Sequence, residues 1–202
     1  VQPSYQFIKA LLNHEQGLHI DNEHFMIISP DEGSMSRAIY LANILGVDMG
    51  MYYKRLDYSK NIGGRHPIAA YEFLGPNVAG KDMILIDDMI SSGETILKIA
   101  SLLKERGAGR IYLCSTFGLF TDNLKKFDEA HAAGVFDKLL TTNMVYQSDE
   151  LLSKPYYISC DMSKYIALII DTLNHDMSVS HLLNPVDRIK RCVNNYMAQY
   201  EK

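Results

Sequence analysis

The residues best suited to chemistry lie in one short stretch, "ILIDDMISSGETI", Ile84–Ile96. An apolar run ends in two adjacent acids, Asp87 and Asp88, and a small polar loop then opens a helix. The loop residues are Ser91, Ser92, Gly93, Glu94 and Thr95. Backbone N–H groups at a helix start lack partners inside the helix, so together with hydroxyls they favour an anion. Adjacent carboxylates suit sugar hydroxyls or a divalent ion. The pattern predicts a site for a phosphorylated sugar.

A plainer interpretation competes with this one. A capped helix after a strand, with solvated acids at the turn, accounts for Asp87 and Asp88 taken by themselves. For the acid pair alone we favour that interpretation. The complete string reverses the preference, because acids, hydroxyls, a glycine and a helix start seldom coincide without an anion to bind.

The string "LIDDMISSGET" resembles the ribose-5-phosphate-binding signature shared by phosphoribosyltransferases and PRPP synthetases, the ribose-phosphate pyrophosphokinases. The resemblance implies that Asp87 and Asp88 hold the ribose hydroxyls and that the segment 91–95 holds the 5-phosphate. Two residues depart from the pattern. Ser91 stands where PRPP synthetases usually carry an acid, and Glu94 stands where glycine is usual. A carboxylate that faces a phosphate repels it, so we expect Glu94 to turn outward or the affinity to fall.

A second stretch, "ISPDEGSMSR" at residues 28–37, reads on its own as a strand, a turn at Asp31 and a helix. It resembles the PRPP synthetase segment in which a strand ends in Ser-Pro-Asp before a loop of small residues. The resemblance implies that Asp31 approaches Mg²⁺ and the C1 end of the ribose. It also implies that the loop from Glu32 to Ser36, with Gly33 and Ser34, presents N–H groups to the pyrophosphoryl product.

Two cations, Lys54 and Arg55, follow the next expected strand. PRPP synthetases carry a lysine and an arginine here on a loop that reaches over the transferring phosphates. The resemblance therefore implies a catalytic role for both, by offsetting the charge that develops during transfer. Arg55 is adjacent to the lysine rather than two positions away as in the family. Lys60, Arg65 and His66 lie in the same polar stretch, where we expect them to be solvated.

The elements that must position these residues alternate between strands and helices. Apolar runs predict strands at 24–29, 48–54, 68–75, 82–88, 110–118, 138–143 and 156–161. Helical spacing predicts helices at 3–13, 34–45, 94–106, 121–133 (capped by Thr121) and 162–174. This alternation indicates an α/β fold with a mostly parallel sheet flanked by helices. The resemblance implies a type I phosphoribosyltransferase-like version of it.

The simplest domain division is a phosphoribosyltransferase-like, ribose-5-phosphate-binding domain at 1–183 and a C-terminal tail at 184–202, expected to be helical. The chain begins with Val1 rather than methionine, which indicates a processed or truncated chain. In the family the preceding half supplies ATP recognition and a catalytic histidine. No phosphate loop of the G-x-x-x-x-G-K-[ST] type replaces it here.

Composition narrows the class of protein. The chain has 202 residues, 47% of them hydrophobic, and a net charge of −4. These values suit a soluble domain and argue against a nucleic-acid or membrane-surface partner. No apolar run approaches the roughly 20 residues of a membrane span. The cysteines Cys114, Cys160 and Cys192 lie far apart. Cys114 and Cys160 lie in apolar runs, so we expect them to be buried, inert thiols, which suits a reducing cytoplasm.

The resemblance implies one activity above others: ribose-phosphate diphosphokinase, the Mg²⁺-dependent transfer of pyrophosphate from ATP to the C1 hydroxyl of ribose 5-phosphate. The products would be PRPP and AMP, and this chain would be the sugar-phosphate-binding half, inactive alone. Two alternatives stay open. One is a phosphoribosyltransferase that uses PRPP, and the other is a non-catalytic, PRPP synthetase-like regulatory subunit. The resemblance also implies a homo-oligomer.

Overall fold

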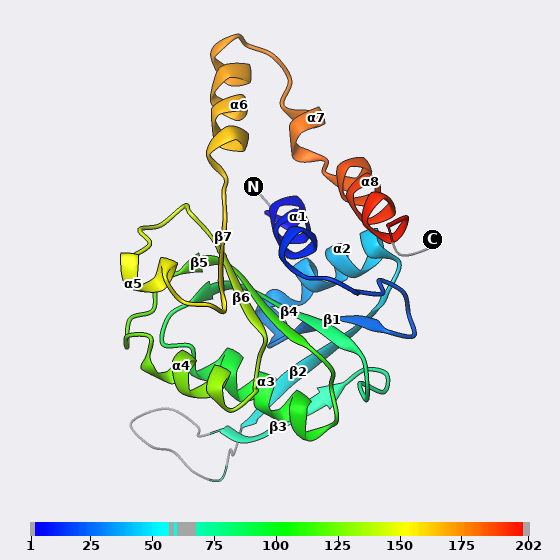
Figure 1. The fold of residues 1–202 in the computed structure, drawn as a ribbon, viewed down its shortest axis with the longest axis vertical. Helices are drawn as coiled ribbons and strands as arrows, with labels where there is room; N and C mark the ends of the chain where they lie inside the picture. The colour runs from blue at the N-terminus through cyan, green and yellow to red at the C-terminus, as the bar shows by residue number, and fades with distance from the viewer. Residues whose placement is uncertain (1–2, 57–58, 60–67, 200–202) are drawn as a thin grey trace.

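The computed structural model describes residues 3–56, 59 and 68–199, and in these ranges it shows a seven-stranded sheet flanked by helices (Figure 1). The strands are β1 Phe25–Ser29, β2 Asp48–Leu56, β3 Ile68–Leu74, β4 Asp82–Ile90, β5 Ile111–Gly118, β6 Lys138–Thr142 and β7 Tyr157–Cys160. Their order is β3-β2-β1-β4-β5-β6-β7, and each neighbouring pair is parallel except the antiparallel β2 and β3. The predicted α/β class is confirmed.

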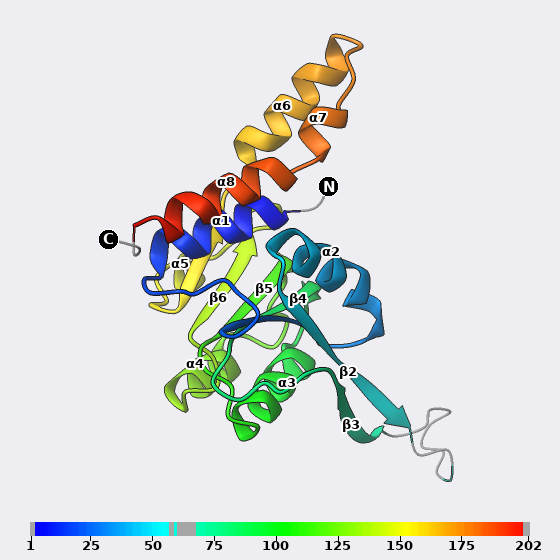
Figure 2. The same cartoon turned by 90° about the vertical axis from the view of Figure 1, so that its right-hand side faces the viewer.

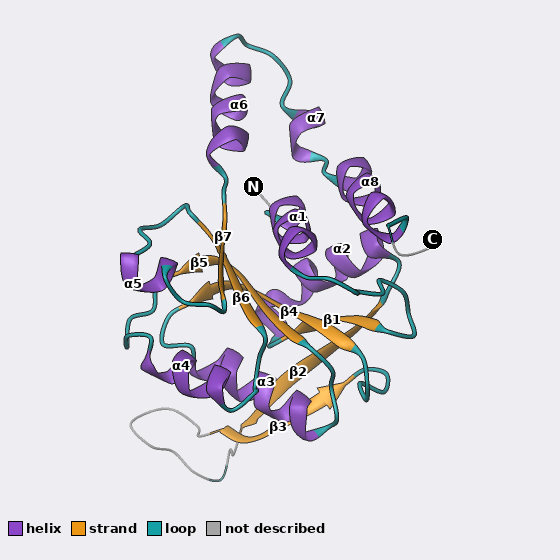
Figure 3. Ribbon diagram, in the orientation of Figure 1, coloured by secondary structure: helices purple, strands orange, loops and turns teal. Residues whose placement is uncertain are grey.

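Helices cover both faces of the sheet (Figure 3). They are α1 Ser4–His14, α2 Met35–Leu45, α3 Glu94–Glu105, α4 Lys125–Ala132, α5 Asp149–Leu152, α6 Ser163–Asn174, α7 Ser180–Leu183 and α8 Val186–Met197. One core layer joins α1, α2 and α8 to the sheet, and a second joins α3 and α4 to its other face. Every residue of β1 is buried, as expected for a strand covered on both sides.

The helices α6 and α7 project away from the sheet, whereas α8 returns to lie along α1 (Figures 1 and 2). The side chains of Ile189 and Tyr196 on α8 are buried in the same core layer as α1 and α2. The predicted division at residue 183 stays a prediction.

Three details differ from the sequence-based expectation. The strand β4 does not end at Asp88 but continues to Ile90, which pairs with Gly118 of β5. The predicted cap at Thr121 is wrong: α4 begins at Lys125, whose backbone N–H donates to Asn123 Oδ1 at 2.9 Å. The four-residue α5 was not predicted, since one turn is too short to show helical spacing.

Three further expectations concern the basic residues after β2, membrane spans and the cysteines. Lys60, Arg65 and His66 lie outside the described residues. Within the described ranges, no helix is both long and apolar enough to cross a membrane. Cys114 and Cys160 are buried free thiols, and burial raises the pKa of Cys160 to about 12. The expected burial is therefore confirmed at these two cysteines, whereas their inertness and a cytoplasmic location stay predictions.

Candidate functional site

A pocket opens at the carboxyl edge of β1 and β4, which are neighbours in the sheet. The loop after β1 and the acid pair of β4 are more than 50 residues apart in the chain. Its volume is about 300 Å³. The lining residues come from the loop after β1 and from the end of β4 with its following loop. They are Asp31, Gly33, Ser34, Asp87, Asp88, Met89, Ile90, Ser91, Ser92, Gly93, Glu94, Thr95 and Ile96. The two stretches that sequence analysis singled out therefore meet in one cavity.

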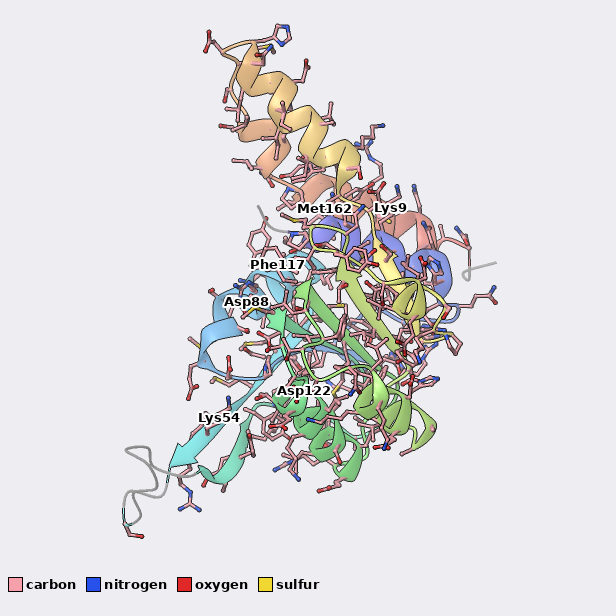
Figure 4. All side chains as sticks on the ribbon, turned by 90° about the vertical axis from the view of Figure 1, so that its left-hand side faces the viewer. Lys9, Lys54, Asp88, Phe117, Asp122 and Met162 are labelled. Atoms are coloured by element: carbon pink, nitrogen blue, oxygen red, sulfur yellow. The ribbon has the colours of Figure 1, made fainter. Side chains whose placement is uncertain are left out.

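Figure 4 shows where this edge lies in the molecule. The labelled residues Lys54, Asp88, Phe117 and Met162 follow one another along the molecule, and they belong to or follow β2, β4, β5 and β7. They thus trace the carboxyl ends of the parallel strands, where ligands of open α/β sheets bind.

The acid pair lies near the end of β4 and is held by Ser34, in the turn before α2, and by Arg37 on α2. Ser34 Oγ donates to Asp87 Oδ1 at 2.7 Å, and Arg37 Nη2 donates to Asp88 Oδ2 at 3.1 Å. Successive strand residues point to opposite faces, so the two carboxylates are presented differently. Asp87 is partly buried, whereas the Asp88 side chain is 57% exposed.

Burial raises the pKa of Asp87 above its ordinary value, and the negative charge of Asp31 acts in the same direction. Hydrogen bonds from Ser34 and from the backbone N–H of Asp88, at 2.8 Å, act against this rise. The charged form of the Asp87 carboxyl group is therefore stabilised by the hydrogen bonds that it accepts from Ser34 and Asp88. Such a group readily accepts further hydrogen bonds from ligand hydroxyls.

The loop after β4 has the backbone of an anion cradle. Gly93 precedes α3 with φ of +80°, a left-handed conformation that favours glycine. A Cβ atom at this position would lie 2.3 Å from Phe127 Cζ of α4, so the ring closes the space beneath the loop. The backbone N–H of Glu94 donates to Ser92 Oγ at 3.4 Å. The loop thus turns sharply over an aromatic ring and aims a helix N-terminus at the cavity.

A second loop, residues 119–124 after β5, supports the first. Ser91 Oγ and Thr121 Oγ1 share a hydrogen bond of 3.2 Å, and the Thr121 N–H donates to the Ser91 carbonyl at 3.1 Å. Thr121 was expected to cap a helix, but instead it holds Ser91, the first residue of the loop predicted to bind phosphate. The Ser91 hydroxyl is therefore held in place although Ser91 is exposed.

Glu94 turns outward, which is the arrangement that sequence analysis required for phosphate binding. Its side chain is 72% exposed, and Oε1 lies 3.0 Å from Lys126 Nζ. Lys126 also lies 3.1 Å from Asp122 Oδ2. The carboxylate at the mouth of the pocket therefore has a cation beside it.

The Asp31 loop forms the other end of the cavity. The Asp31 carboxylate accepts from the Gly33 N–H at 3.1 Å and begins the 3-10 turn Glu32–Ser34. Lys54 Nζ on β2 lies 3.7 Å from Asp31 Oδ2. Gly33 and Ser34 line the cavity, whereas Glu32 is exposed and does not.

Lys54 and Arg55 point to different places. Arg55 Nε lies 2.7 Å from Glu72 Oε1 of β3, and Tyr53 OH donates to the same carboxylate. Tyr53 and Arg55 share one face of β2, and Lys54 has the opposite face, because side chains alternate along a strand. The structure therefore brings Lys54 to the Asp31 loop and does not bring Arg55 there. The catalytic role predicted for Arg55 gains no support from this geometry.

Three residues that contact the site are not among the residues predicted for it. Arg37 and Lys126 contact pocket acids from α2 and α4, and Thr121 holds Ser91. Arg37 stood inside the recognised stretch, so its place on the first turns of a helix was a usable signal. Lys126 lies 32 positions from Glu94, and no spacing rule connects them.

Comparisons with known proteins identify the family to which this chain belongs. Residues 3–145 match the phosphoribosyl transferase domain family. The chain is 30% identical over 180 residues to the ribose-phosphate pyrophosphokinase of Vibrio parahaemolyticus, which covers 87% of this chain and 52% of that protein. It is 30% identical over 175 residues to the enzyme of the same name from Pasteurella multocida, covering 86% and 52%.

The fold comparison points the same way. The structure of phosphoribosylpyrophosphate synthetase from Mycobacterium smegmatis matches with a TM-score of 0.62 at 23% identity, over 75% of this chain and 45% of that one. This likeness shows the predicted phosphoribosyltransferase-like fold. The chain spans about half the length of the curated relatives it matches. It belongs to the phosphoribosyl transferase domain family, and over most of its length it is similar to ribose-phosphate pyrophosphokinases.

Proposed function

We propose that this chain is the sugar-phosphate-binding half of a ribose-phosphate diphosphokinase. One observation carries the proposal: a single cavity has a helix N-terminus and hydroxyls at one end and the Asp31 loop at the other, with the acid pair between them. Ribose 5-phosphate has the matching order of groups. Its phosphate suits the loop at 91–95, its vicinal hydroxyls suit Asp87 and Asp88, and its C1 hydroxyl then faces Asp31.

The reaction requires little covalent chemistry from the protein. The C1 hydroxyl oxygen attacks the β-phosphorus of ATP, the bond to the oxygen bridging the α- and β-phosphates breaks, and AMP leaves with that oxygen. The hydroxyl proton passes to water, so the products are PRPP, AMP and H⁺. Catalysis then rests on position and charge. Lys54, beside Asp31, is a cation placed to offset negative charge on the transferring group.

The carboxylates in the cavity fit a Mg²⁺ ion whose remaining ligands come from the substrate and from water. Asp31 and Asp87 line the same cavity, and the charge of Asp31 affects the pKa of Asp87. Among the residues that the structure describes, no three His, Cys, Asp or Glu side chains converge on one metal position. Mg²⁺ commonly takes one or two carboxylates and completes its shell with substrate phosphates and water. Bound in this way, it would neutralise phosphate charge next to Asp31.

ATP recognition belongs, in this proposal, to parts of the protein beyond these 202 residues, since the matched relatives are about twice as long. The likeness to pyrophosphokinases also supports, as a proposal, a homo-oligomer acting in the cytoplasm. The chain on its own would bind the sugar phosphate without turnover.

The test is calorimetric titration of the protein with ribose 5-phosphate and Mg²⁺, beside the Asp87→Ala, Asp88→Ala double variant. Asp171→Ala is the matched control, because this carboxylate is 70% exposed on α6, away from the pocket. Saturable binding that is lost only in the double variant supports the proposal. Equal binding by all three proteins contradicts it.

A turnover assay separates the remaining alternatives. Release of AMP from ATP and ribose 5-phosphate supports the diphosphokinase. Release of pyrophosphate from PRPP with a nucleobase supports a phosphoribosyltransferase instead. Binding by the full-length protein with no turnover in either assay supports a regulatory subunit.

A further inference from the structure

An ion pair between Lys126 of α4 and Glu94 lies at the mouth of the cavity. Glu94 lines the mouth of the cavity proposed for the 5-phosphate, and a carboxylate there repels a phosphate dianion. Lys126 Nζ lies 3.0 Å from Glu94 Oε1 and so places a positive charge against it. Lys126 itself is not among the residues that line the cavity.

The position of Lys126 in its own helix is unfavourable. It is the second residue of α4, at the end where the helix dipole disfavours cations. Two acids surround it: Glu94 at 3.0 Å and Asp122 at 3.1 Å. Both contacts raise the pKa of Lys126, so the amine stays charged. Lys126 therefore links the start of α4 to the loop 91–95 through charge contacts with Asp122 and Glu94.

The link is also mechanical. Phe127, the next residue of α4, closes the space under Gly93, and Thr121 holds Ser91. The loop before α4 therefore contacts Ser91, and the first turn of α4 contacts Gly93 and Glu94. Asp122, in the loop between Thr121 and α4, keeps Lys126 directed toward Glu94.

We infer that Lys126 is a positioning residue for phosphate binding: it holds the Glu94 carboxylate outward and cancels its charge, so that the loop can accept a phosphate monoester. The inference rests on the proposed function of the same pocket and adds a residue to it. It predicts that the cost of losing Lys126 comes from Glu94. The effect on affinity must therefore disappear when Glu94 loses its charge.

The experiment is a double-mutant cycle on the full-length protein, with ribose 5-phosphate and, separately, inorganic phosphate as probes. Lys126→Gln should weaken ribose 5-phosphate binding roughly three- to fivefold, the upper end of what an exposed charge contact contributes. Glu94→Gln should bind at least as tightly as the parent protein, and the Lys126→Gln, Glu94→Gln double variant should return to within about twofold of it. KM for ribose 5-phosphate should rise in Lys126→Gln while kcat is unchanged.

Lys125→Gln is the matched control. Lys125 precedes Lys126 on the same helix, is 79% exposed and pairs with Glu129 instead. It should leave affinity unchanged, and an equal loss in both lysine variants would show only a general charge effect and overturn the inference. A loss in Lys126→Gln that persists with Glu94→Gln would also overturn it, because Lys126 would then act on the phosphate directly or only support the fold.

The two probes separate this inference from the proposed function. If the parent protein binds inorganic phosphate but not ribose 5-phosphate, the proposed function fails, and rescue of phosphate binding by Glu94→Gln still supports the inference. If ribose 5-phosphate binds and Lys126→Gln changes nothing, the function stands and the inference fails. If neither probe binds, both fail.

Discussion

At the scale of single residues, the buried carboxylate of Asp87 lowers the stability of the fold while it serves the proposed binding site. Burial and the charge of Asp31 raise its pKa above the ordinary 3.8, so the folded protein resists ionising it. Above the raised pKa the carboxylate is charged in both states, and this charge costs folding free energy. The cost is relieved as the pH falls through the folded-state pKa toward the unfolded value, because the folded protein then takes up the proton.

The first prediction follows from that sign. Asp87→Asn should raise the urea midpoint of unfolding at pH 7 and abolish ribose 5-phosphate binding, and its advantage in midpoint should shrink as the pH approaches 4. Asp88→Asn, at a carboxylate 57% exposed, should change the midpoint little. Urea titrations at the two pH values check this. A lower midpoint for Asp87→Asn at pH 7 would mean that hydrogen bonds to the carboxylate outweigh its burial.

A second prediction separates two adjacent cations. Lys54→Ala should reduce kcat about 100-fold, the usual loss for one electrostatic donor at a phosphoryl-transfer site. Arg55→Ala should reduce it less than about threefold, because Arg55 pairs with Glu72 on the opposite face of β2. Steady-state kinetics of both variants of the full-length protein decide the point. A comparable loss in Arg55→Ala would show that β2 rearranges during the reaction.

Contacts between residues close in the chain could be predicted from the sequence, whereas contacts between distant residues could not. The acids and hydroxyls between Asp87 and Thr95 are local, and their meeting in one pocket was predictable. The alternation along β2 could also have separated Lys54 from Arg55 beforehand. The hydrogen bond from Ser34 to Asp87 joins residues 53 positions apart. It depends on β1 and β4 being neighbours, which composition and periodicity do not reveal.

At the scale of elements, boundaries were less predictable than the elements themselves. All seven strands were expected, yet β4 continues two residues beyond Asp88, because Met89 and Ile90 still pair with Phe117 and Gly118. Local pattern cannot show where a neighbouring strand ends. The start of α4 offered a better signal in Asn123, whose side chain accepts from the Lys125 N–H.

The third prediction concerns the loop that begins α3. Gly93→Ala should destabilise the fold by about 1–2 kcal/mol for the left-handed backbone and by about 1–3 kcal/mol more for overlap with Phe127. Gly80→Ala shares the backbone term, with φ of +75°, but its Cβ would have nothing within 4 Å, so it is the matched control. Urea unfolding gives both values. Adding Phe127→Leu should restore part of the loss in Gly93→Ala and none in Gly80→Ala, and equal costs for the two alanine variants would contradict the clash.

At the scale of the whole molecule, the C-terminal helix decides how far the domain extends. The side chain of Ile189 is 0% exposed, and that of Tyr196 is 5% exposed, in the core layer of α1 and α2. Tyr196 OH accepts from the Leu18 N–H at 3.0 Å and donates to the Glu15 carbonyl at 3.0 Å. These contacts tie α8 to the start of the chain, nearly 180 residues away. These buried side chains lead us to expect that α8 unfolds together with the rest of the domain.

The last prediction turns this into a measurement. Ile189→Ala should lower the free energy of unfolding by about 2–4 kcal/mol, because a cavity opens in a packed core. Tyr196→Phe should lower it by about 1–2 kcal/mol, since the Leu18 N–H loses its acceptor. Both losses should appear in one cooperative urea transition, while the affinity for ribose 5-phosphate at 25 °C stays within about twofold of the parent value. If instead Ile189→Ala leaves the main transition unchanged, α8 unfolds by itself and the division at residue 183 is correct. A single shifted transition would mean that the cooperative domain includes α8, because its buried side chains belong to the same core as Phe7 of α1.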